Sequence, residues 1–209
     1  MAGRTFIARH GETVFNADQR IQGEVPHTPL TRTGFAQADA MGAALAKWLG
    51  TRQTLELWSS PAGRAQQTMA IMAEHIGGDF HDVKLDARLR EIDMGEWSGR
   101  RFADIEAEIG PFACPETRLF TQVPQGGETY SEVAARLRDW IDEVVRIPDA
   151  RLVVMHGMGS RVLRGLLLNL PADPRFGVPI APSLPQGSLV MIGNGEEKII
   201  RLDQTGTVE

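Results

Sequence analysis

Two short apolar runs of this sequence each end in a histidine followed by a glycine. The first run, residues 4–9, leads into His10, and the second, residues 151–155, leads into His156. Both runs have the length and the apolar content of buried strands. If the strands lie parallel in one sheet, both histidines leave it at the carboxyl edge, where open α/β sheets bind ligands. The pattern predicts one site built from residues far apart in the chain.

Strands and helices are expected to alternate along the rest of the sequence. Further strands are predicted near 55–58, 187–193 and 197–202, and helices near 31–48, 62–76, 101–109, 129–146 and 159–170. The first long helix has a predicted apolar stripe of Phe35, Ala38, Met41, Leu45 and Trp48. The turn Gly193-Asn-Gly195 predicts a hairpin between the last two strands. This order predicts a three-layer α/β/α fold whose mostly parallel sheet is covered on both faces.

The length and the composition predict a single domain over residues 1–209. Apolar residues make up 42% and charged residues 23% of the 209, as in soluble globular proteins. Residues at about 80–127 show little regular periodicity, and they are too numerous for a simple connection. We interpret this segment as a cap-like insertion over the carboxyl edge of the sheet.

Charge and cysteine content limit the partners and the compartment. The net charge of −5 argues against a nucleic-acid binder, although a local arginine cluster can still bind a phosphate ester. With one cysteine, the chain forms no internal disulfide. The sequence shows no leader pattern and no long apolar run. A cytoplasmic protein that does not bind a membrane is therefore expected.

His10 is the first candidate for chemistry. A lone histidine after a strand is more often a structural hydrogen-bonding residue. Here Arg9 precedes it and Gly11 follows it. The arginine offers a planar fork to two phosphate oxygens, the glycine permits close approach of the backbone, and an imidazole nitrogen can attack phosphorus.

Arg64 and His156 are the next candidates. Arg64 occurs early in the helix that follows the strand at 55–58, hence near the same sheet edge. There it can hold an anion together with the amides of the helix start. His156 read alone could equally be a core histidine, but beside His10 it is expected to donate a hydrogen bond to a phosphoryl oxygen.

An acid is needed to protonate the leaving oxygen of a phosphate ester. The irregular segment offers Glu91, Asp93 and Glu96. In an extended chain Glu91 and Asp93 would lie on one face, so spacing does not separate them. A metal site is not supported, because no His-Glu-x-x-His or Cys-x-x-Cys pair occurs and arginines flank the candidate site.

Together these positions resemble the histidine phosphatase superfamily, whose fold is like that of phosphoglycerate mutase. The matching blocks, in chain order, are Arg9-His10-Gly11-Glu12-Thr13 with Asn16, Gln22-Gly23, Pro29-Leu30-Thr31, Ser59-Ser60-Pro61 with Arg64, Leu89-Arg90-Glu91, Gly126-Gly127-Glu128 and His156-Gly157. The resemblance selects Glu91 as the acid.

The resemblance implies a metal-independent phosphomonoesterase. His10 would form a phosphohistidine, and Glu91 would act as general acid and then as base. Arg9, Arg64 and His156 would hold the phosphoryl oxygens, helped by the amide of Gly157. The resemblance also implies that Asn16, Gln22 and Gly23 contact substrate. No metal or organic cofactor is implied.

Two departures from the family pattern occur, His27 where an aspartate is common and Gly157-Met-Gly159 after the second histidine. Family mutases resemble longer chains with a Tyr-Gly pair where Met94-Gly95 stands, which favours hydrolysis over mutase-type phosphoryl transfer. A catalytically silent protein that binds a phosphorylated ligand is a third interpretation. The expected partner is a small phosphorylated metabolite rather than nucleic acid or membrane, and a homodimer is left open.

Overall fold

The computed structural model describes residues 3–50, 55–144 and 149–200. Its six-stranded sheet has the order β3-β2-β4-β1-β5-β6. β1, β4, β2 and β3 run parallel, and β5 pairs antiparallel with both β1 and β6. The strands are β1 (Thr5–Arg9), β2 (Glu56–Ser59), β3 (Lys84–Leu85), β4 (Arg151–Met155), β5 (Leu189–Gly193) and β6 (Glu196–Ile200). The mostly parallel sheet expected from the sequence is confirmed.

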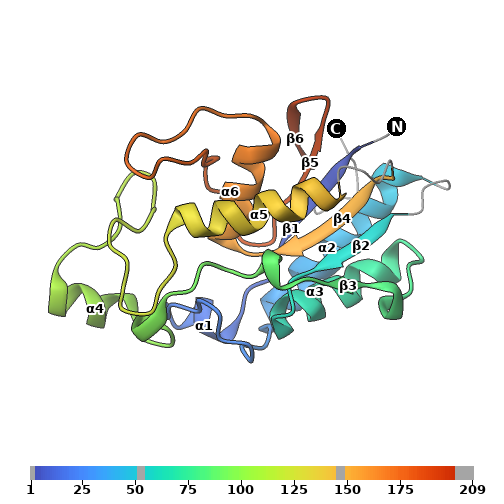
Figure 1. The fold of residues 1–209 in the computed structure, drawn as a ribbon. Coiled ribbons are helices and arrows are strands. Elements are labelled where there is room, and N and C mark those ends of the chain that lie inside the picture. Colours follow the sequence, from blue (N-terminus) through green and yellow to red (C-terminus); the bar gives the residue numbers. More distant parts are fainter. Residues whose placement is uncertain (1–2, 51–54, 145–148, 201–209) are drawn as a thin grey trace.

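Helices cover both faces of the sheet (Figure 1). α2 (Arg32–Leu49) and α3 (Gly63–His75) lie on one face, and α5 (Tyr130–Val144) and α6 (Gly157–Leu167) on the other. The shorter elements are α1 (Val14–Ala17), α4 (Phe102–Ile109) and the 3₁₀ turns η1 (Phe80–Asp82), η2 (Ala87–Leu89) and η3 (Gly95–Trp97). The three-layer arrangement is confirmed, although the ends predicted for two elements, at 145–146 and 201–202, lie outside the described residues.

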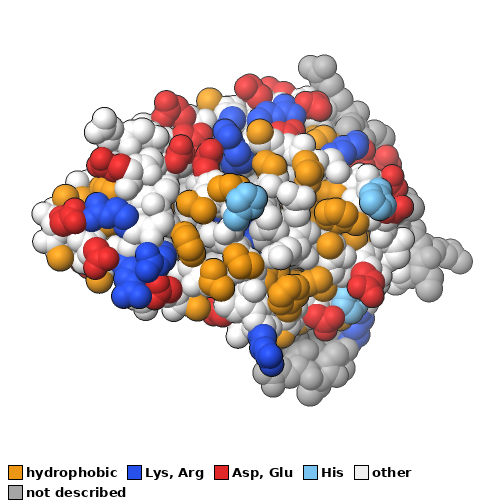
Figure 2. All heavy atoms as spheres, turned by 90° about the horizontal axis from the view of Figure 1, so that it is seen from below, with side chains coloured by type: hydrophobic (Ala, Val, Ile, Leu, Met, Phe, Trp, Pro, Cys, Tyr) orange, Lys and Arg blue, Asp and Glu red, His pale blue; other side chains and the backbone are white. Residues whose placement is uncertain are grey.

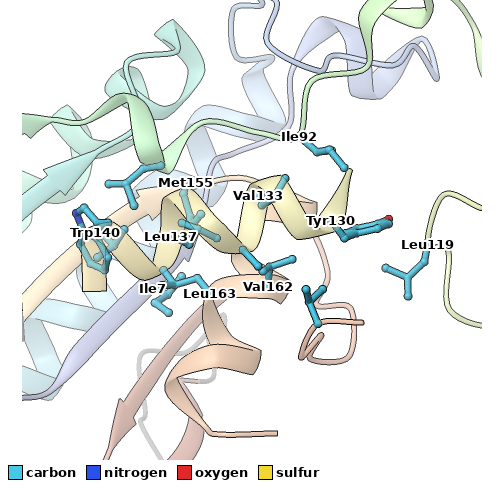
Figure 3. Packing of buried hydrophobic residues seen from close by; sticks show 14 of the residues in the cluster. Ile7, Ile92, Leu119, Tyr130, Val133, Leu137, Trp140, Met155, Val162 and Leu163 are labelled. Atoms are coloured by element: carbon cyan, nitrogen blue, oxygen red, sulfur yellow. The ribbon is translucent and has the colours of Figure 1, made fainter. Parts of the chain in front are cut away.

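Alternation along the strands divides the core between these two faces. On β1, Phe6 and Ala8 pack with α2 and α3, while Ile7 packs with α5 and α6. On β4, Val154 faces the first layer and Met155 the second, as the two-residue period of a strand requires. Figure 3 shows the buried cluster on the α5 and α6 side, in which α5 packs over the sheet. Each fully buried large aliphatic side chain contributes roughly 1.5–3 kcal/mol.

Two predicted details are wrong, and both have simple causes. Phe35 is 46% exposed. The inward position of the first turn of α2 belongs to Gly34, and the next residue is rotated away by about 100°. α6 begins at Gly157 rather than at 159, so that His156 is its N-cap residue. The sequence of this first turn, Gly-Met-Gly, hides the helix start because glycine is a poor helix former.

The segment predicted to be a cap is partly integrated into the main body. Lys84–Leu85 is the edge strand β3, which was not expected from the sequence. Trp97, Ile105 and Phe112 belong to the same buried cluster as α5 side chains. The boundaries of the insertion, and the single-domain interpretation itself, stay predictions.

The hairpin at the end of the chain is confirmed. Gly193 pairs with Glu196, and the two residues between them have positive φ angles, 55° at Asn194 and 77° at Gly195. Two positive φ angles are the requirement of a type I′ turn, which Asn-Gly satisfies.

The surface seen from below carries charges of both signs (Figure 2). Blue and red side chains lie interspersed, with apolar groups between them, and neither sign forms a large continuous region on this face. In the part of the chain that the structure describes, no helix is both long and apolar enough to cross a bilayer.

Candidate active site

The parallel strands β1 and β4 bring the two histidines together. The strands are neighbours, with Arg9 opposite Met155, so the next residue of each leaves the sheet at the same edge. His10 is 2% exposed and His156 fully buried. Their ring centroids are 5.2 Å apart and the rings meet edge to face. The predicted convergence is confirmed.

The hydrogen bonds of His10 fix its tautomer. Nδ1 lies 2.7 Å from the carbonyl oxygen of Gly11, which can only accept, so Nδ1 carries the proton. Nε2 therefore holds the lone pair. Gln186 Nε2 donates to the carbonyl oxygen of His10 at 2.6 Å. The same Gln186 nitrogen is 3.3 Å from Nδ1, but two donors face each other there, so the carbonyl bond is the real one.

The surroundings keep His10 neutral. Burial lowers the pKa of His10 well below its usual value, and the charges of Arg64 and Arg9 lower it further. A neutral imidazole with a free Nε2 is the form of histidine that acts as a nucleophile.

Gly11 is required by close packing. Its amide donates to Thr68 Oγ1 at 3.1 Å. A Cβ at Gly11 would lie 2.3 Å from the carbonyl oxygen of Gly34, at the start of α2. The glycine after His10 thus lets α2 approach the end of β1.

Arg64 is a buried cation with many partners. It is 1% exposed. One terminal nitrogen donates to the carbonyl oxygen of Val25 at 2.7 Å and to Thr28 Oγ1 at 3.1 Å, and the other to the carbonyl oxygen of Gly23 at 2.9 Å. Nε donates to His156 Nδ1 at 3.2 Å. Burial lowers the pKa of Arg64 to about 10, so the guanidinium stays charged at neutral pH.

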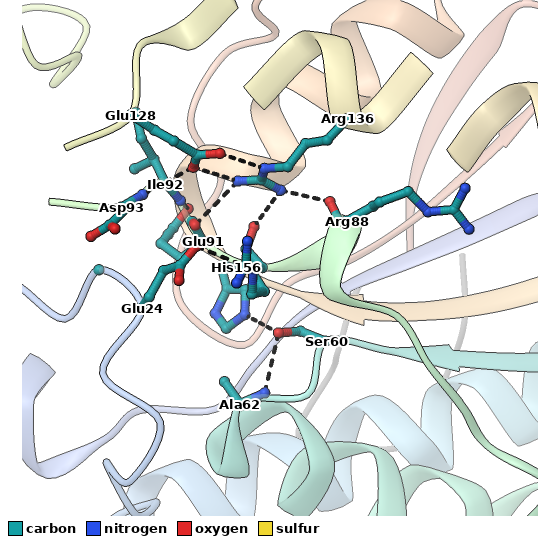
Figure 4. Close-up of polar contacts among 12 residues, drawn as sticks. Glu24, Ser60, Ala62, Arg88, Glu91, Ile92, Asp93, Glu128, Arg136 and His156 are labelled. Atoms are coloured by element: carbon teal, nitrogen blue, oxygen red, sulfur yellow. Dashed lines mark hydrogen bonds and ion pairs between the residues drawn. The ribbon is translucent and has the colours of Figure 1, made fainter. Parts of the chain in front are cut away.

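His156 uses both of its ring nitrogens within the chain. Because Nδ1 accepts from Arg64, the proton is on Nε2, which donates to Ser60 Oγ at 2.7 Å (Figure 4). Ser60 Oγ also accepts from the amide of Ala62 at 3.3 Å. Burial lowers the pKa of His156 well below its usual value, with Arg64 as the next cause. Of the two histidines, His10 is therefore the one with a lone pair to offer.

Arg9 has donors to spare. One terminal nitrogen donates to the carbonyl oxygen of Leu184 at 3.1 Å. Its Nε is buried and finds no hydrogen-bond partner among the described residues. Burial lowers the pKa of Arg9, and the charge of Glu91 partly opposes this. A Cβ at Gly157 would come within 3.3 Å of the Arg9 guanidinium, so the glycine at the start of α6 leaves room for it.

Glu91 is held at the start of α6. Its Oε1 accepts from the amides of Ile92 at 3.0 Å and Gly159 at 2.8 Å, and its Oε2 accepts from the amide of Met158 at 3.1 Å. A carboxylate is stabilised there by free N–H groups and by the helix dipole. The charge of Glu91 also acts on both Arg9 and Arg64.

Arg136 on α5 fixes the backbone around Glu91 (Figure 4). It donates to the carbonyl oxygens of Arg88 at 2.6 Å, Arg90 at 3.0 Å and Glu91 at 3.2 Å. Its Nε pairs with Glu128 at 2.8 Å. The irregular segment that carries Glu91 is thereby attached to a long, rigid helix.

A pocket of about 230 Å³ opens beside these residues. It is lined by Glu24, Pro26, Pro61, Ala62, Arg64, Arg90 and Glu91. Of the two carboxylates that spacing left open, Glu91 lines this pocket and Asp93 does not. His10 and His156 are buried and do not line it, but Arg64, which contacts His156, does.

The structure places the remaining predicted substrate contacts within the local fold. Asn16 Oδ1 accepts from the amide of Thr13 at 3.1 Å, in a capping box at the start of α1. Gln22 Oε1 accepts from Thr13 Oγ1 at 2.9 Å. The carbonyl oxygen of Gly23 is one of the acceptors of Arg64. Substrate contact by Asn16, Gln22, Gly23 or Gly157 stays a prediction.

Residues to which the sequence analysis assigned no role complete this arrangement. Ser60 follows β2, which also ends at the carboxyl edge, so the rule that located His10 would have located it as well. Gln186 precedes β5, and no local pattern points to it. The same holds for Arg136 and Glu24.

Comparison with known proteins agrees with this geometry. The family model of the histidine phosphatase superfamily (branch 1) matches residues 5–201. Probable phosphoglycerate mutase GpmB of Erwinia tasmaniensis is 35% identical over 174 residues, covering 81% of this chain and 77% of the relative. Glucosyl-3-phosphoglycerate phosphatase of Mycobacterium tuberculosis is 36% identical over 180 residues, with the same two coverages.

The solved structures give the same assignment. Mycobacterial glucosyl-3-phosphoglycerate phosphatase in complex with VO3 superposes with a TM-score of 0.76 at 29% identity, covering 95% of this chain and 97% of that one. The resemblance noted in the sequence is thereby confirmed over nearly the whole chain. This protein belongs to the histidine phosphatase superfamily.

Proposed function

We infer that the protein hydrolyses phosphomonoesters through a phosphohistidine on His10, with Glu91 as general acid and base. The observation that carries this proposal is the state of His10. Its Nδ1 donates to the Gly11 carbonyl, which leaves the Nε2 lone pair free near the buried Arg64 and the half-buried Arg9. Support also comes from relatives named as a phosphatase and as a phosphoglycerate mutase.

In the first step Nε2 of His10 attacks phosphorus and the bond from phosphorus to the ester oxygen breaks. The departing oxygen takes a proton from Glu91, so the leaving group departs as a neutral alcohol. In the second step Glu91 accepts a proton from water while the water oxygen attacks phosphorus. The phosphorus–nitrogen bond breaks, inorganic phosphate forms, and Glu91 is again protonated.

Arg9, Arg64 and His156 hold the phosphoryl oxygens in this proposal. The buried Nε of Arg9 gains an acceptor when an anion enters. In the structure Arg64 Nε donates a hydrogen bond to His156 Nδ1. Once His156 carries its proton on Nδ1 instead, a phosphoryl oxygen can accept hydrogen bonds from both nitrogens. Ser60 permits that change, because a hydroxyl can donate to Nε2 as well as accept from it.

Phosphate release from a panel of small phosphomonoesters between about pH 5 and 8, run beside a 3-phosphoglycerate mutase assay, tests the proposal. Release without isomerisation supports a phosphatase. Isomerisation without release would assign the mutase reaction, and inactivity in both would favour a silent phospho-ligand-binding protein. The cytoplasmic location and the homodimer also stay predictions.

The pH dependence follows from the depressed pKa of His10. Because this pKa lies below 6.5, the ring stays neutral as the pH falls from 8 to 6.5. We therefore expect kcat/KM, corrected for ionisation of the substrate phosphate, to be level over that range for p-nitrophenyl phosphate. A loss with a midpoint near 6.5 would mean that the nucleophile has an ordinary pKa and is not buried as described.

Chelation is expected to leave the activity intact. Among the described residues no three His, Cys, Asp or Glu side chains gather as a metal site would require. Prolonged dialysis against EDTA should leave kcat/KM within about twofold of the untreated enzyme. A loss that zinc or magnesium restores would contradict the metal-independent mechanism.

A further inference from the structure

The pocket beside Arg64 and Glu91 is the space into which a leaving group must project. The proposed mechanism places the phosphoryl group between Arg9 and Arg64, and the departing oxygen must reach Glu91 to receive its proton. The residues that line the pocket besides Arg64 and Glu91 then face the rest of the substrate. The charged ones are Glu24 and Arg90.

Glu24 and Arg90 form an ion pair in this pocket. Arg90 Nε lies 3.1 Å from Glu24 Oε1, and the two side chains are 41% and 26% exposed. In Figure 4 the side chain of Glu24 extends toward Glu91. The charge of Arg90 is thus balanced by Glu24, and a second carboxylate, that of Glu91, lines the same pocket.

The negative field at Glu24 comes from more than one group. Burial raises the pKa of Glu24. Arg90 opposes this rise, while Asp93 and Glu128 add to it. The nearby cation Arg136 is engaged by Glu128 and by three carbonyl oxygens, so it is not available to a ligand.

A second anionic group on the substrate would meet this field. Glu24 already balances the charge of Arg90, so an anion that approaches Arg90 would also be repelled by the Glu24 carboxylate. A hydroxyl group has no such cost, because it can donate to Glu24 and accept from Arg90 while the ion pair persists.

We propose that Glu24 and Arg90 form a leaving-group subsite, in which Glu24 selects neutral, hydroxyl-bearing alcohols and rejects a second negative charge. This inference rests on the proposed function, because it requires that the leaving group lie on the Glu91 side. It narrows the substrate class to phosphate esters of polyols, as distinct from esters whose alcohol carries a carboxylate or a second phosphate near the reacting oxygen.

The test uses glycerol 3-phosphate and 3-phosphoglycerate, which differ by a CH₂OH group in place of a carboxylate. The wild type should release phosphate from glycerol 3-phosphate with a kcat/KM on the order of tenfold higher. Glu24→Gln should reduce that ratio by about fivefold or more, chiefly by improving the carboxylate substrate. Glu74→Gln, at the far end of α3, makes the same change in net charge and should leave the ratio unaltered.

Each result decides the matter. A wild type that prefers 3-phosphoglycerate, or a Glu24→Gln ratio within twofold of wild type, would overturn charge selection by Glu24. Equal losses of activity on both substrates would overturn it too, because they would indicate that Glu24 acts in proton transfer or in folding. A thermal unfolding measurement would distinguish these two roles. Failure of the wild type to release phosphate from either substrate or from p-nitrophenyl phosphate would instead overturn the proposed function.

Discussion

Replacing His10 with alanine is expected to lower kcat on the order of 10⁴-fold for every phosphomonoester, because no other group can form the covalent intermediate. His156 does not substitute for it. Both of its ring nitrogens are bonded within the chain, to Arg64 and to Ser60, whereas Nε2 of His10 holds a free lone pair. The loss should appear in kcat/KM as well, since the nucleophile acts before the first product leaves.

Trapping the intermediate separates the roles of the two histidines. Wild-type enzyme mixed with a ³²P-labelled ester and quenched in alkaline detergent should carry one alkali-stable, acid-labile label. His10→Ala should carry none. His156→Gln should turn over slowly and still be labelled, because it loses a donor to the phosphoryl group and keeps the nucleophile.

A matched control variant distinguishes loss of the nucleophile from loss of the folded structure. His81 is exposed in η1, so His81→Ala should retain wild-type activity and labelling. Circular dichroism should show His10→Ala folded. Activity of His10→Ala above about a hundredth of wild type, or label that persists in it, would remove His10 from the nucleophilic role.

The fold could be predicted where a periodic pattern corresponds to a buried face. β1 and β4 each contain a continuous apolar stretch, residues 6–8 and 152–155, and α5 has a clear stripe that faces the sheet, with Leu137 and Trp140 fully buried. The edge strand β3 has two exposed residues, so it carries no burial pattern to detect. Phe35 was misplaced because a glycine, which periodicity analysis ignores, occupies the inward position next to it.

The site could be predicted to the extent that it follows from strand direction. His10, Arg64 and His156 each lie at or just after the end of a parallel strand, so topology brings them to one edge. Glu91 could not be predicted in this way, because it lies in an irregular segment whose apolar residues show no helical or strand periodicity. Its selection over Asp93 came from the family resemblance, and the structure supplies a physical reason in the α6 amides that hold it. Gln186 and Arg136 contact the site across long sequence separations, which only tertiary structure shows.

Glu91→Gln is expected to affect substrates according to their leaving groups. For glycerol 3-phosphate, whose alkoxide cannot leave without a proton, kcat/KM should fall by about 10²–10⁴-fold. For p-nitrophenyl phosphate it should fall only a few-fold, because nitrophenolate leaves unaided. Since kcat/KM includes steps only up to the departure of the first product, this difference isolates the acid role of Glu91 from its role as base.

The role of Glu91 as general base can be measured in the pre-steady-state phase of the reaction. Without Glu91 to activate water, the phosphoenzyme formed from p-nitrophenyl phosphate should accumulate. Stopped-flow measurement should then show a burst of nitrophenolate close to the enzyme concentration, followed by a slow steady rate. Loss of the negative charge also strengthens the field of Arg9 and Arg64, so phosphate binding should tighten.

The control for this variant must account for the bonds that Glu91 makes. Glutamine keeps an oxygen for two of the α6 and Ile92 amides but turns an NH₂ group toward the third, which costs about 1 kcal/mol of stability. Asp93→Asn is the matched variant. The aspartate accepts from the Gly95 amide, which asparagine can still do, and it does not line the pocket. Asp93→Asn should therefore leave both esters nearly unaffected. Equal losses on the two esters in Glu91→Gln, or a leaving-group dependence in Asp93→Asn, would move the acid role away from Glu91.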